Sequence, residues 1–313
     1  MNSKKRGFYP TQVIFSTTNA CNLHCAHCFV SRKEEKLPVK DALAFLQKCA
    51  DSGQISHVGF TGGEPFLYME FLLELTKATI AHDLLFDQIM TNGDWWQNQQ
   101  DLENKLQALY KAGYDGKIGL SWDLYHGQEP QRMQTFIKSV QSIFGSQSIN
   151  IQTVISQEKG GVSLPLARST LLATPSNGGD PRNAPQDIPV YTLPRTYPSE
   201  DPQAWQARHW FKEDYCQGPG NILYVHSNGN IAPCCGFANE NPALFIGHIS
   251  DSFETIIKNA DENKMVQICF YQGLSHYRKH DFKKKMSSMG QKIPGRTKDI
   301  CSFCDFVCKM ASI

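Results

Sequence analysis

Three cysteines close together near the start of the chain are the residues most able to do chemistry. They lie in Cys21-Asn-Leu-His-Cys25-Ala-His-Cys28, in a loop that follows the apolar run at residues 13–15. Three thiolates can hold a 4Fe–4S cluster by three of its four irons, which leaves the fourth iron open to another ligand. Clustered cysteines also bind zinc, so the spacing by itself leaves both kinds of metal centre open.

A second motif, Thr61-Gly-Gly-Glu-Pro65, follows the strand-like run His57–Phe60. A structural zinc knuckle gives no reason for a Gly-Gly-Glu turn at the end of the next strand. With the cysteine loop, this turn makes the chain resemble the radical S-adenosylmethionine (SAM) superfamily. In that family the open iron binds the amino and carboxylate groups of SAM, and one electron from the cluster splits SAM into methionine and a 5′-deoxyadenosyl radical.

The resemblance implies roles for residues of both motifs and of the later strand ends. The three cysteines hold the cluster. Gly62, Gly63 and Glu64 line the methionyl amino group, where glycine lets the backbone approach the ligand closely. His27 stands where the family has an aromatic residue whose backbone contacts adenine, and histidine leaves that contact possible. Four strand-end residues are candidates for holding the ribose and the carboxylate of SAM: Thr91, Asn92, Ser121 and Asp123. For Asn92 and Asp123 the other explanation is that they only stabilise turns.

Seven of the eleven cysteines follow residue 215 and indicate a second metal site, because the chain shows no secretory segment that would favour disulfides. Cys216 and Cys234 flank a predicted hairpin with an Asn-Gly turn. Their spacing, C-x12-G-x4-C, resembles the opening of the twitch and SPASM extensions of peptide-modifying radical SAM enzymes. The terminal Cys301-x2-Cys304-x3-Cys308 has fewer cysteines than a full SPASM tail and favours one auxiliary 4Fe–4S cluster. The expected ligands are Cys216, Cys234, Cys301 and Cys304, Cys308 can replace one of them, and zinc is the chemical alternative.

Two further cysteines are interpreted as buried thiols. Cys49 lies on the apolar face of a helix predicted at residues 39–52. Cys269 lies near the end of a helix predicted at residues 252–270. Whether Cys269 or Cys308 ligates the auxiliary cluster stays open at this point.

Cys235 adjoins an expected ligand and is either a spare buried thiol or a hydrogen-atom donor. The run at residues 120–126, the sequence Pro233–Cys235 and the terminal Cys301-x2-Cys304 together resemble radical SAM peptide epimerases of the epipeptide type. Such enzymes invert L-residues to D-residues in ribosomally made peptides. The resemblance implies that the 5′-deoxyadenosyl radical removes a Cα hydrogen and that Cys235 returns hydrogen to the opposite face. The thiyl radical left on Cys235 is then reduced through the auxiliary cluster.

Strand-like and helix-like segments alternate from residue 12 to about residue 195, which predicts a parallel sheet with crossover helices. In such βα folds the chemistry lies on loops after the carboxyl ends of strands. Both motifs and the four strand-end candidates lie on such loops. The predicted strands are 12–16, 57–60, 86–91, 117–122, 150–155 and 189–193, and the predicted helices of this part are 39–52, 70–82, 101–111, 130–144 and 165–173.

The expected fold class is therefore α/β, a partial (β/α)6 radical SAM barrel followed by a small cysteine-rich hairpin-plus-helix domain of twitch or SPASM type. We expect the barrel at residues 1–200, a linker at 201–215 and the auxiliary-cluster domain at 216–313. A chain of 313 residues with 41% apolar content is long enough for two packed units.

Charge and hydropathy restrict the partners. The chain has 31 basic and 30 acidic residues, so its net charge gives no reason to expect binding to nucleic acid or to a membrane surface. No apolar run approaches the ~20 residues that span a bilayer, and we expect a cytoplasmic location. From the resemblance we expect a ribosomally made precursor peptide as substrate and a one-electron reductant such as flavodoxin or ferredoxin.

Three other functions stay open on the sequence. One is oxidative formation of a thioether or carbon–carbon crosslink in a peptide, in which Cys235 has no role. The second is radical SAM chemistry on a small molecule. The third is a metal-binding module without catalysis. The sequence names neither the substrate nor the modified residue, nor the oligomeric state.

Overall fold

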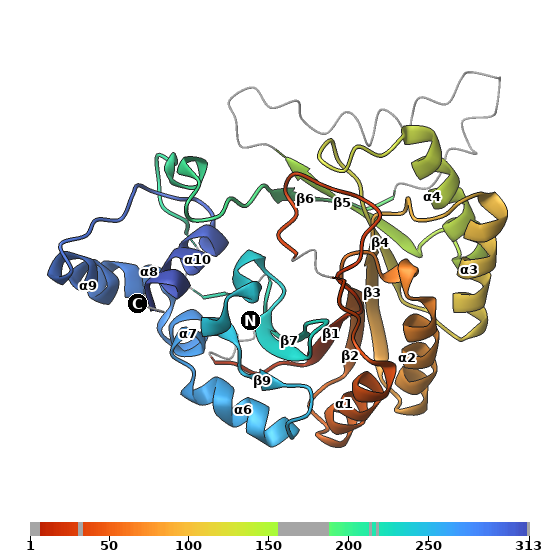
Figure 1. Ribbon diagram of the computed structural model, residues 1–313, viewed down its shortest axis with the longest axis horizontal. Coiled ribbons are helices and arrows are strands. Elements are labelled where there is room, and N and C mark those ends of the chain that lie inside the picture. Colours follow the sequence, from red (N-terminus) through yellow and green to blue (C-terminus); the bar gives the residue numbers. More distant parts are fainter. Residues whose placement is uncertain (1–6, 31–33, 156–187, 213–214, 217–218, 312–313) are drawn as a thin grey trace, which may run out of the picture. The chain divides into compact units, whose positions relative to one another are not determined.

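The computed structural model describes residues 7–30, 34–155, 188–212, 215–216 and 219–311 (Figure 1). By their internal contacts these residues fall into two compact units. The first, here called the βα unit, consists of residues 15–43 and 57–195. The second, here called the cysteine-rich unit, consists of residues 1–14, 44–56 and 196–313. The domain limits expected from the sequence, at residues 200 and 216, stay a prediction.

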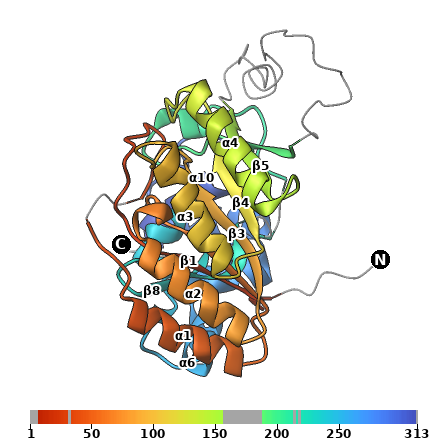
Figure 2. The ribbon, with the colours of Figure 1, turned by 90° about the vertical axis from the view of Figure 1, so that its right-hand side faces the viewer.

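Within the described residues, the βα unit contains five parallel strands that neighbour one another in sequence order, β2-β3-β4-β5-β6. A helix follows each of the first three, and in Figure 2 these helices succeed one another along one face of the strands. This is the βα pattern expected from the sequence. The first part of β1 and most of α1 belong to the cysteine-rich unit by these limits. The elements up to residue 195 are β1 (Gln12–Ser16), α1 (Val39–Asp51), β2 (His57–Thr61), η1 (Pro65–Leu67), α2 (Met69–Ala81), β3 (Leu85–Thr91), α3 (Gln99–Lys111), β4 (Lys117–Ser121), α4 (Pro130–Phe144), β5 (Ile149–Ile155) and β6 (Val190–Pro194).

An apolar layer of strand and helix side chains holds the βα unit together. Ile89 of β3, Leu120 of β4 and Ile151 of β5 are completely buried. So are Leu106 of α3 and Phe136 of α4. Full burial of one such side chain contributes roughly 1.5–3 kcal/mol. This layer fixes the carboxyl ends of the strands, where the candidate residues lie.

The cysteine-rich unit is built on an antiparallel hairpin, as the sequence predicts. β7 (Gly220–Val225) pairs with β8 (Asn230–Cys234), and β8 also pairs with β9 (Gly247–His248). Gly229 in the turn has φ +86°, a conformation that favours glycine, and an added Cβ would lie 2.5 Å from Nε2 of His248. The hairpin ends at Cys234, which pairs with Gly220, so the β7–β8 pairing fixes the position of this cysteine.

The prediction of a single helix at residues 252–270 is wrong, because the helix is interrupted at Asn263. Its Oδ1 accepts hydrogen bonds from the backbone N–H groups of Met265 (2.8 Å) and Val266 (3.1 Å), which caps a new helix. The chain then continues as a π-helix that contains Cys269. The remaining elements are η3 (Pro202–Trp205), η4 (Phe237–Glu240), η5 (Pro242–Leu244), α6 (Phe253–Glu262), α7 (Lys264–Val266), the π-helix η6 (Gln267–Gln272), α8 (Leu274–Tyr277), the π-helix η7 (Arg278–Phe282), α9 (Lys283–Ser288) and α10 (Ile300–Ala311).

The other predicted strands and helices of the βα pattern are confirmed to within two residues at each end. The helix predicted at residues 165–173 lies outside the described residues. In the part of the chain that the structure describes, every helix is too short or too polar to cross a membrane.

Candidate functional site

The cysteine loop follows β1 and lies against the turn after β2. The N–H of Gly63 donates to the carbonyl of Thr18 (2.6 Å), and the N–H of Glu64 donates to the carbonyl of Ala20 (2.8 Å). These two bonds fix the backbone directly before Cys21. The Gly-Gly-Glu turn therefore positions the loop that carries the three cysteines.

The two glycines of this turn are required by the close approach of the loop. A Cβ on Gly62 would lie 2.5 Å from the carbonyl oxygen of Thr18, and one on Gly63 would lie 2.2 Å from that of Ala20. Gly62 also has φ +143°. The sequence suggested approach to a ligand as the reason for these glycines. The structure adds another reason, which is room for the backbone of the cysteine loop itself.

Glu64 is completely buried and uses both carboxylate oxygens inside the βα unit. Oε1 accepts from the Thr91 hydroxyl (2.8 Å) and from the N–H of Phe66 (3.1 Å). Oε2 accepts from the N–H of Asn92 (2.9 Å). Burial raises the pKa of Glu64 to about 7, although the three donors oppose the rise. The carboxylate thus fastens the end of β3 to the turn after β2.

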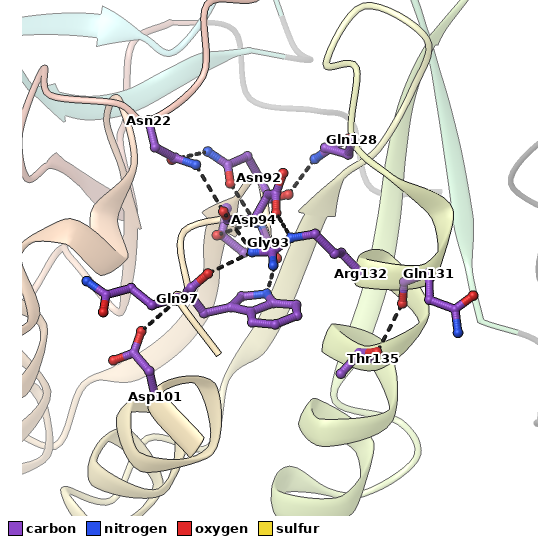
Figure 3. Close-up of polar contacts among 12 residues, drawn as sticks. Asn22, Asn92, Gly93, Asp94, Gln97, Asp101, Gln128, Gln131, Arg132 and Thr135 are labelled. Atoms are coloured by element: carbon purple, nitrogen blue, oxygen red, sulfur yellow. Dashed lines mark hydrogen bonds and ion pairs between the residues drawn. The ribbon is translucent and has the colours of Figure 1, made fainter. Parts of the chain in front are cut away.

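Asn92 links the end of β3 to the cysteine loop (Figure 3). Its Nδ2 donates to Oδ1 of Asn22 (3.0 Å) and lies 3.6 Å from Sγ of Cys21. Burial raises the pKa of the half-buried Cys21 thiol. Cys25 is half-buried and Cys28 is exposed. Three sulfurs on one partly open loop, with an amide donor on one of them, fit an iron–sulfur cluster that must leave one iron accessible.

Arg132 of α4 braces the loop after β3 (Figure 3). Its guanidinium pairs with Asp94 and lies 3.6 Å from the centre of the Trp96 ring. Its Nη2 also donates to the carbonyl of Trp96 (2.7 Å). Sequence reasoning missed this residue, because an arginine in the first turns of a helix carries no motif.

Gln128, which the sequence also left unassigned, joins the ends of β3 and β4. Its Nε2 donates to the carbonyl of Ser121 (2.9 Å) and to that of Asn92. The Thr91 hydroxyl accepts from Nε1 of Trp95 (3.1 Å). Three of the predicted strand-end residues, Thr91, Asn92 and Ser121, are therefore brought together in one hydrogen-bonded layer.

Asp123, two residues after the end of β4, accepts hydrogen bonds from its own turn and from β5. Its Oδ1 accepts from the N–H of Tyr125 (2.8 Å), and its Oδ2 accepts from the N–H of Val154 (3.1 Å). The same Oδ1 is 2.8 Å from Nδ1 of His126. The His27 and His126 rings meet edge-on with centroids 4.8 Å apart, and burial lowers the pKa of His27. His27, Asp123 and His126 offer ligand atoms within 4.8 Å of one another.

The cysteine-rich unit gathers five cysteines around one pocket. The four expected ligands, Cys216, Cys234, Cys301 and Cys304, line it together with Cys269. The other side chains that line it are apolar, so sulfur is the metal-binding atom that this lining offers. An all-sulfur donor set suits an iron–sulfur cluster, and it also suits zinc.

Glycine makes room for sulfur in this pocket as well. A Cβ on Gly220 would lie 2.6 Å from Sγ of Cys216, and one on Gly236 would lie 3.2 Å from Sγ of Cys301. The N–H of Cys216 donates to the carbonyl of Cys269 (3.0 Å), which joins the chain before β7 to the π-helix. The cysteines thus sit on backbone segments that are fastened to one another.

The remaining cysteines differ in their surroundings. Cys49 is buried in α1, as predicted, and Cys269 is also buried, but its Sγ is 3.8 Å from that of Cys304. Cys308 is completely buried, hydrogen-bonds to Cys304 and is outside the pocket lining. Cys235 is half-buried, also outside this lining, and its N–H donates to the carbonyl of Pro219 (2.8 Å).

Comparison with known proteins gives a family model and distant relatives. Residues 15–125 match the model described as Radical SAM superfamily. YydG of Bacillus subtilis (strain 168), which its name assigns provisionally to peptide biosynthesis, is 22% identical over 292 residues, 86% of this chain and 83% of that protein. The S-adenosylmethionine-dependent nucleotide dehydratase RSAD2 of Siniperca chuatsi is 34% identical over 101 residues, 29% of this chain and 28% of that protein.

A solved structure agrees with the chain over nearly its full length. Native anSMEcpe with bound AdoMet and Cp18Cys peptide has a TM-score of 0.54, covers 97% of this chain and 98% of its own, and is 14% identical. At that identity the likeness concerns the fold. It is an α/β fold with the parallel sheet of a partial radical SAM barrel and a cysteine-rich C-terminal region.

Proposed function

We propose that this chain is a radical SAM enzyme that modifies a peptide by inverting one of its L-residues to the D-form. The premise rests on the family match at residues 15–125, which contains the cysteine loop, the Gly-Gly-Glu turn and all four strand-end candidates. A peptide substrate is supported by the alignment with YydG, which covers most of both chains. The inversion is supported by Cys234, the last residue of β8, and by Cys235, which follows it directly.

In the proposed enzyme, Cys21, Cys25 and Cys28 hold the first 4Fe–4S cluster. When bound, the cluster and SAM supply a 5′-deoxyadenosyl radical that takes a hydrogen atom from a Cα of the substrate. The chain's own part is to place and shelter these groups. The layer formed by Glu64 and Asn92 fixes the cysteine loop against the strand ends, where SAM is to be bound.

The observation that carries the inversion is the different surroundings of two consecutive cysteines. Cys234 is 7% exposed and lines the five-cysteine pocket. Cys235 is half-buried and is not part of that lining. Cys234 is the last residue of β8, and Cys235 follows it in a bend, where its N–H donates to the carbonyl of Pro219 (2.8 Å). We therefore assign Cys234 to the auxiliary cluster and Cys235 to the role of a thiol hydrogen donor.

The proposed step at Cys235 is a hydrogen-atom transfer. Loss of the Cα hydrogen leaves a planar carbon radical, so a hydrogen that returns to the other face inverts the residue. The S–H bond of Cys235 breaks, a C–H bond forms, and the unpaired electron remains on the sulfur. One electron and one proton then restore the thiol, and the electron comes from a one-electron reductant of the flavodoxin or ferredoxin class. We assign Cys216, Cys234, Cys301 and Cys304 as the ligands of one auxiliary cluster. That cluster would supply one-electron transfer beside Cys235, the neighbour of Cys234.

Turnover in heavy water tests the proposal. The anaerobically reconstituted enzyme is given SAM, a reductant and candidate precursor peptides, and the products are examined by mass spectrometry and chiral amino-acid analysis. A thiol exchanges its hydrogen with solvent, so we expect a gain of one mass unit at a residue that becomes D. A loss of two mass units would instead support a crosslinking enzyme and exclude the epimerase.

A pair of cysteine variants tests the hydrogen donor. Cys235→Ala is expected to cleave SAM but to form no D-residue. The matched control is Cys49→Ala, which removes a buried thiol of α1 outside the pocket lining and is expected to epimerise normally. Normal epimerisation by Cys235→Ala would exclude this cysteine as the donor.

A further inference from the structure

One sulfur outside the expected ligand set contacts a sulfur inside it. Sγ of Cys269 lies 3.8 Å from Sγ of Cys304, and both cysteines are buried. The π-helix η6 fixes the position of Cys269, since the N–H of Gly273 donates to the carbonyl of Ile268 five residues earlier (2.9 Å). π-Helices are rare and are frequent at functional sites.

The distance between these two sulfurs can be compared with the spacing of ligands on a metal centre. Two thiolates on a single tetrahedral metal ion, each about 2.3 Å from it, lie about 3.8 Å apart. In a 4Fe–4S cluster each cysteine binds a different iron, so the ligand sulfurs spread farther apart than that. The observed 3.8 Å is also the distance of an S–H···S hydrogen bond.

The chemistry of a bound cysteine fixes the direction of this hydrogen bond. A cysteine that binds iron has lost its proton, so its sulfur can only accept. If Cys304 is the ligand, Cys269 must keep its proton and donate. Cys308, one helical turn after Cys304 in α10, also hydrogen-bonds to Cys304 and is outside the pocket lining. The sulfur of Cys304 is therefore placed to accept from two thiols.

We propose that Cys269 is a positioning residue of the auxiliary site, whose S–H donates to the Cys304 sulfur and raises the reduction potential of the auxiliary cluster. This inference rests on the proposed function, in which Cys216, Cys234, Cys301 and Cys304 hold that cluster. A hydrogen bond to a ligand sulfur stabilises the reduced, more negative form of a cluster.

Burial in an apolar pocket has the opposite effect, because a low dielectric disfavours the more negative form. The thiols of Cys269 and Cys308 oppose this effect of burial. They donate hydrogen bonds to the Cys304 sulfur, so no water is needed as a donor. A higher potential lets a reductant of the flavodoxin or ferredoxin class reload the auxiliary cluster more readily. Cys269 and Cys308 would then set how easily that cluster is reduced, without binding metal.

The test uses the full chain in a background that holds only the auxiliary cluster, with Cys21→Ala, Cys25→Ala and Cys28→Ala combined. After anaerobic reconstitution, iron and zinc are counted and the midpoint potential is measured by a redox titration followed by EPR. We expect about four irons per chain in this background. Cys269→Ala is expected to keep these irons and to lower the midpoint potential. Cys269→Ser, which retains a hydrogen-bond donor, is expected to restore much of the potential.

Two further variants complete the test. Cys49→Ala, the matched buried cysteine of α1, is expected to leave iron content and potential unchanged. Cys308→Ala is expected to keep the irons and to lower the potential, and it replaces Cys269→Ala if that variant does not fold.

The inference and the proposed function fail in different ways. Loss of iron in Cys269→Ala would make Cys269 a ligand, and an unchanged potential would remove its role; either result overturns the inference but leaves the auxiliary cluster in place. Zinc in place of iron in the background protein would overturn the auxiliary cluster itself, and the inference with it.

Discussion

The two cysteine sites of this chain are built in opposite ways. In the first, three sulfurs lie within eight residues of one loop, and they range from half-buried to exposed. In the second, five cysteines come from four parts of the chain between residues 216 and 304 and surround a pocket lined otherwise by apolar side chains. One site is local and open, and the other is assembled by folding and closed.

The proposed function accounts for this difference. A cluster that binds SAM needs one accessible iron, so the protein cannot enclose that cluster on all sides. A site whose ligands all come from the protein can be enclosed, and its metal then joins segments that are far apart in the chain. Loss of metal is therefore expected to remove activity at the first site and to remove folding energy at the second.

Removal of one ligand from each site is expected to give the largest effects. Cys25→Ala should abolish formation of 5′-deoxyadenosine and lose about four irons, with little change in the thermal stability of the cysteine-rich unit. Cys301→Ala should also lose about four irons, but it should still form 5′-deoxyadenosine from SAM and should unfold at a clearly lower temperature. Chromatography of the SAM products, iron analysis and calorimetry measure these outcomes. Equal loss of stability in both variants would contradict the contrast.

A smaller but still large effect is expected from Gly63→Ala. The new Cβ would lie 2.2 Å from the carbonyl oxygen of Ala20, so the cysteine loop must move. Overpacking of this kind costs about 1–3 kcal/mol, and we expect SAM cleavage to fall at least about tenfold. The control is Gly145→Ala at the end of α4, where φ is +100° and the added Cβ meets nothing within 4 Å.

The control separates strain from placement. Gly145→Ala should also cost about 1–3 kcal/mol, through backbone strain, and should cleave SAM at the normal rate. Urea unfolding and a SAM-cleavage assay are run on both variants. If both lose SAM cleavage equally, instability rather than displacement of the loop is the cause.

The local site could be predicted from the sequence, because spacing alone places Cys21, Cys25 and Cys28 on one loop. The strands that carry the other candidates were also predictable, since apolar residues such as Ile89 and Leu120 recur with the period of their element. The contact of the Gly-Gly-Glu turn with the backbone of the cysteine loop was not predictable. A glycine in a sequence indicates a tight approach but does not show which segment approaches it.

The second site shows where sequence reasoning stops. Cys269 was expected to be a buried thiol within one long helix, and burial is confirmed. Its contact with Cys304 depends on the break at Asn263 and on the π-helix that follows, and both come from tertiary packing. Glu64 is a similar case at the first site. The contact with SAM that the family resemblance implies stays a prediction, and the structure adds three hydrogen bonds that the side chain accepts from the chain itself.

Glu64 also predicts a pH dependence that only the first site should show. Its pKa is raised from 4.5 to about 7 in the folded protein, so between these pH values the folded state binds the extra proton. The unfolding free energy of the cluster-free protein should therefore fall as pH rises from about 4.5 to 7, by up to about 3 kcal/mol from this group.

The variant Glu64→Gln isolates this contribution. Its unfolding free energy should fall less than that of the wild type between pH 5.5 and pH 7.5, measured by urea unfolding of the cluster-free proteins. The slope is compared rather than the absolute value, since an amide cannot satisfy all three donors of the carboxylate. Parallel pH profiles would mean that Glu64 titrates near its ordinary pKa.

The smallest effect concerns Arg132, which braces the first site from outside its loop. Arg132→Lys keeps the positive charge beside Asp94. It loses the stacking of the planar guanidinium on the Trp96 ring and the hydrogen bond from Nη2 to the Trp96 carbonyl. We expect a loss of about 1 kcal/mol in unfolding free energy and a few-fold rise in the KM for SAM. Lys77→Ala, which breaks an exposed pair with Glu74, is the control and should cost less than about 1 kcal/mol with an unchanged KM.

The outcome decides how local the first site is. A raised KM with little change in stability would mean that the cysteine loop depends on a brace from α4, so that the first site is also assembled by folding, though from fewer parts. An unchanged KM would mean that the backbone contacts of Gly63 and Glu64 are sufficient to hold the loop. The first site would then be complete within its two motifs, and the contrast with the five-cysteine pocket would be as strong as the spacing of the sulfurs suggests.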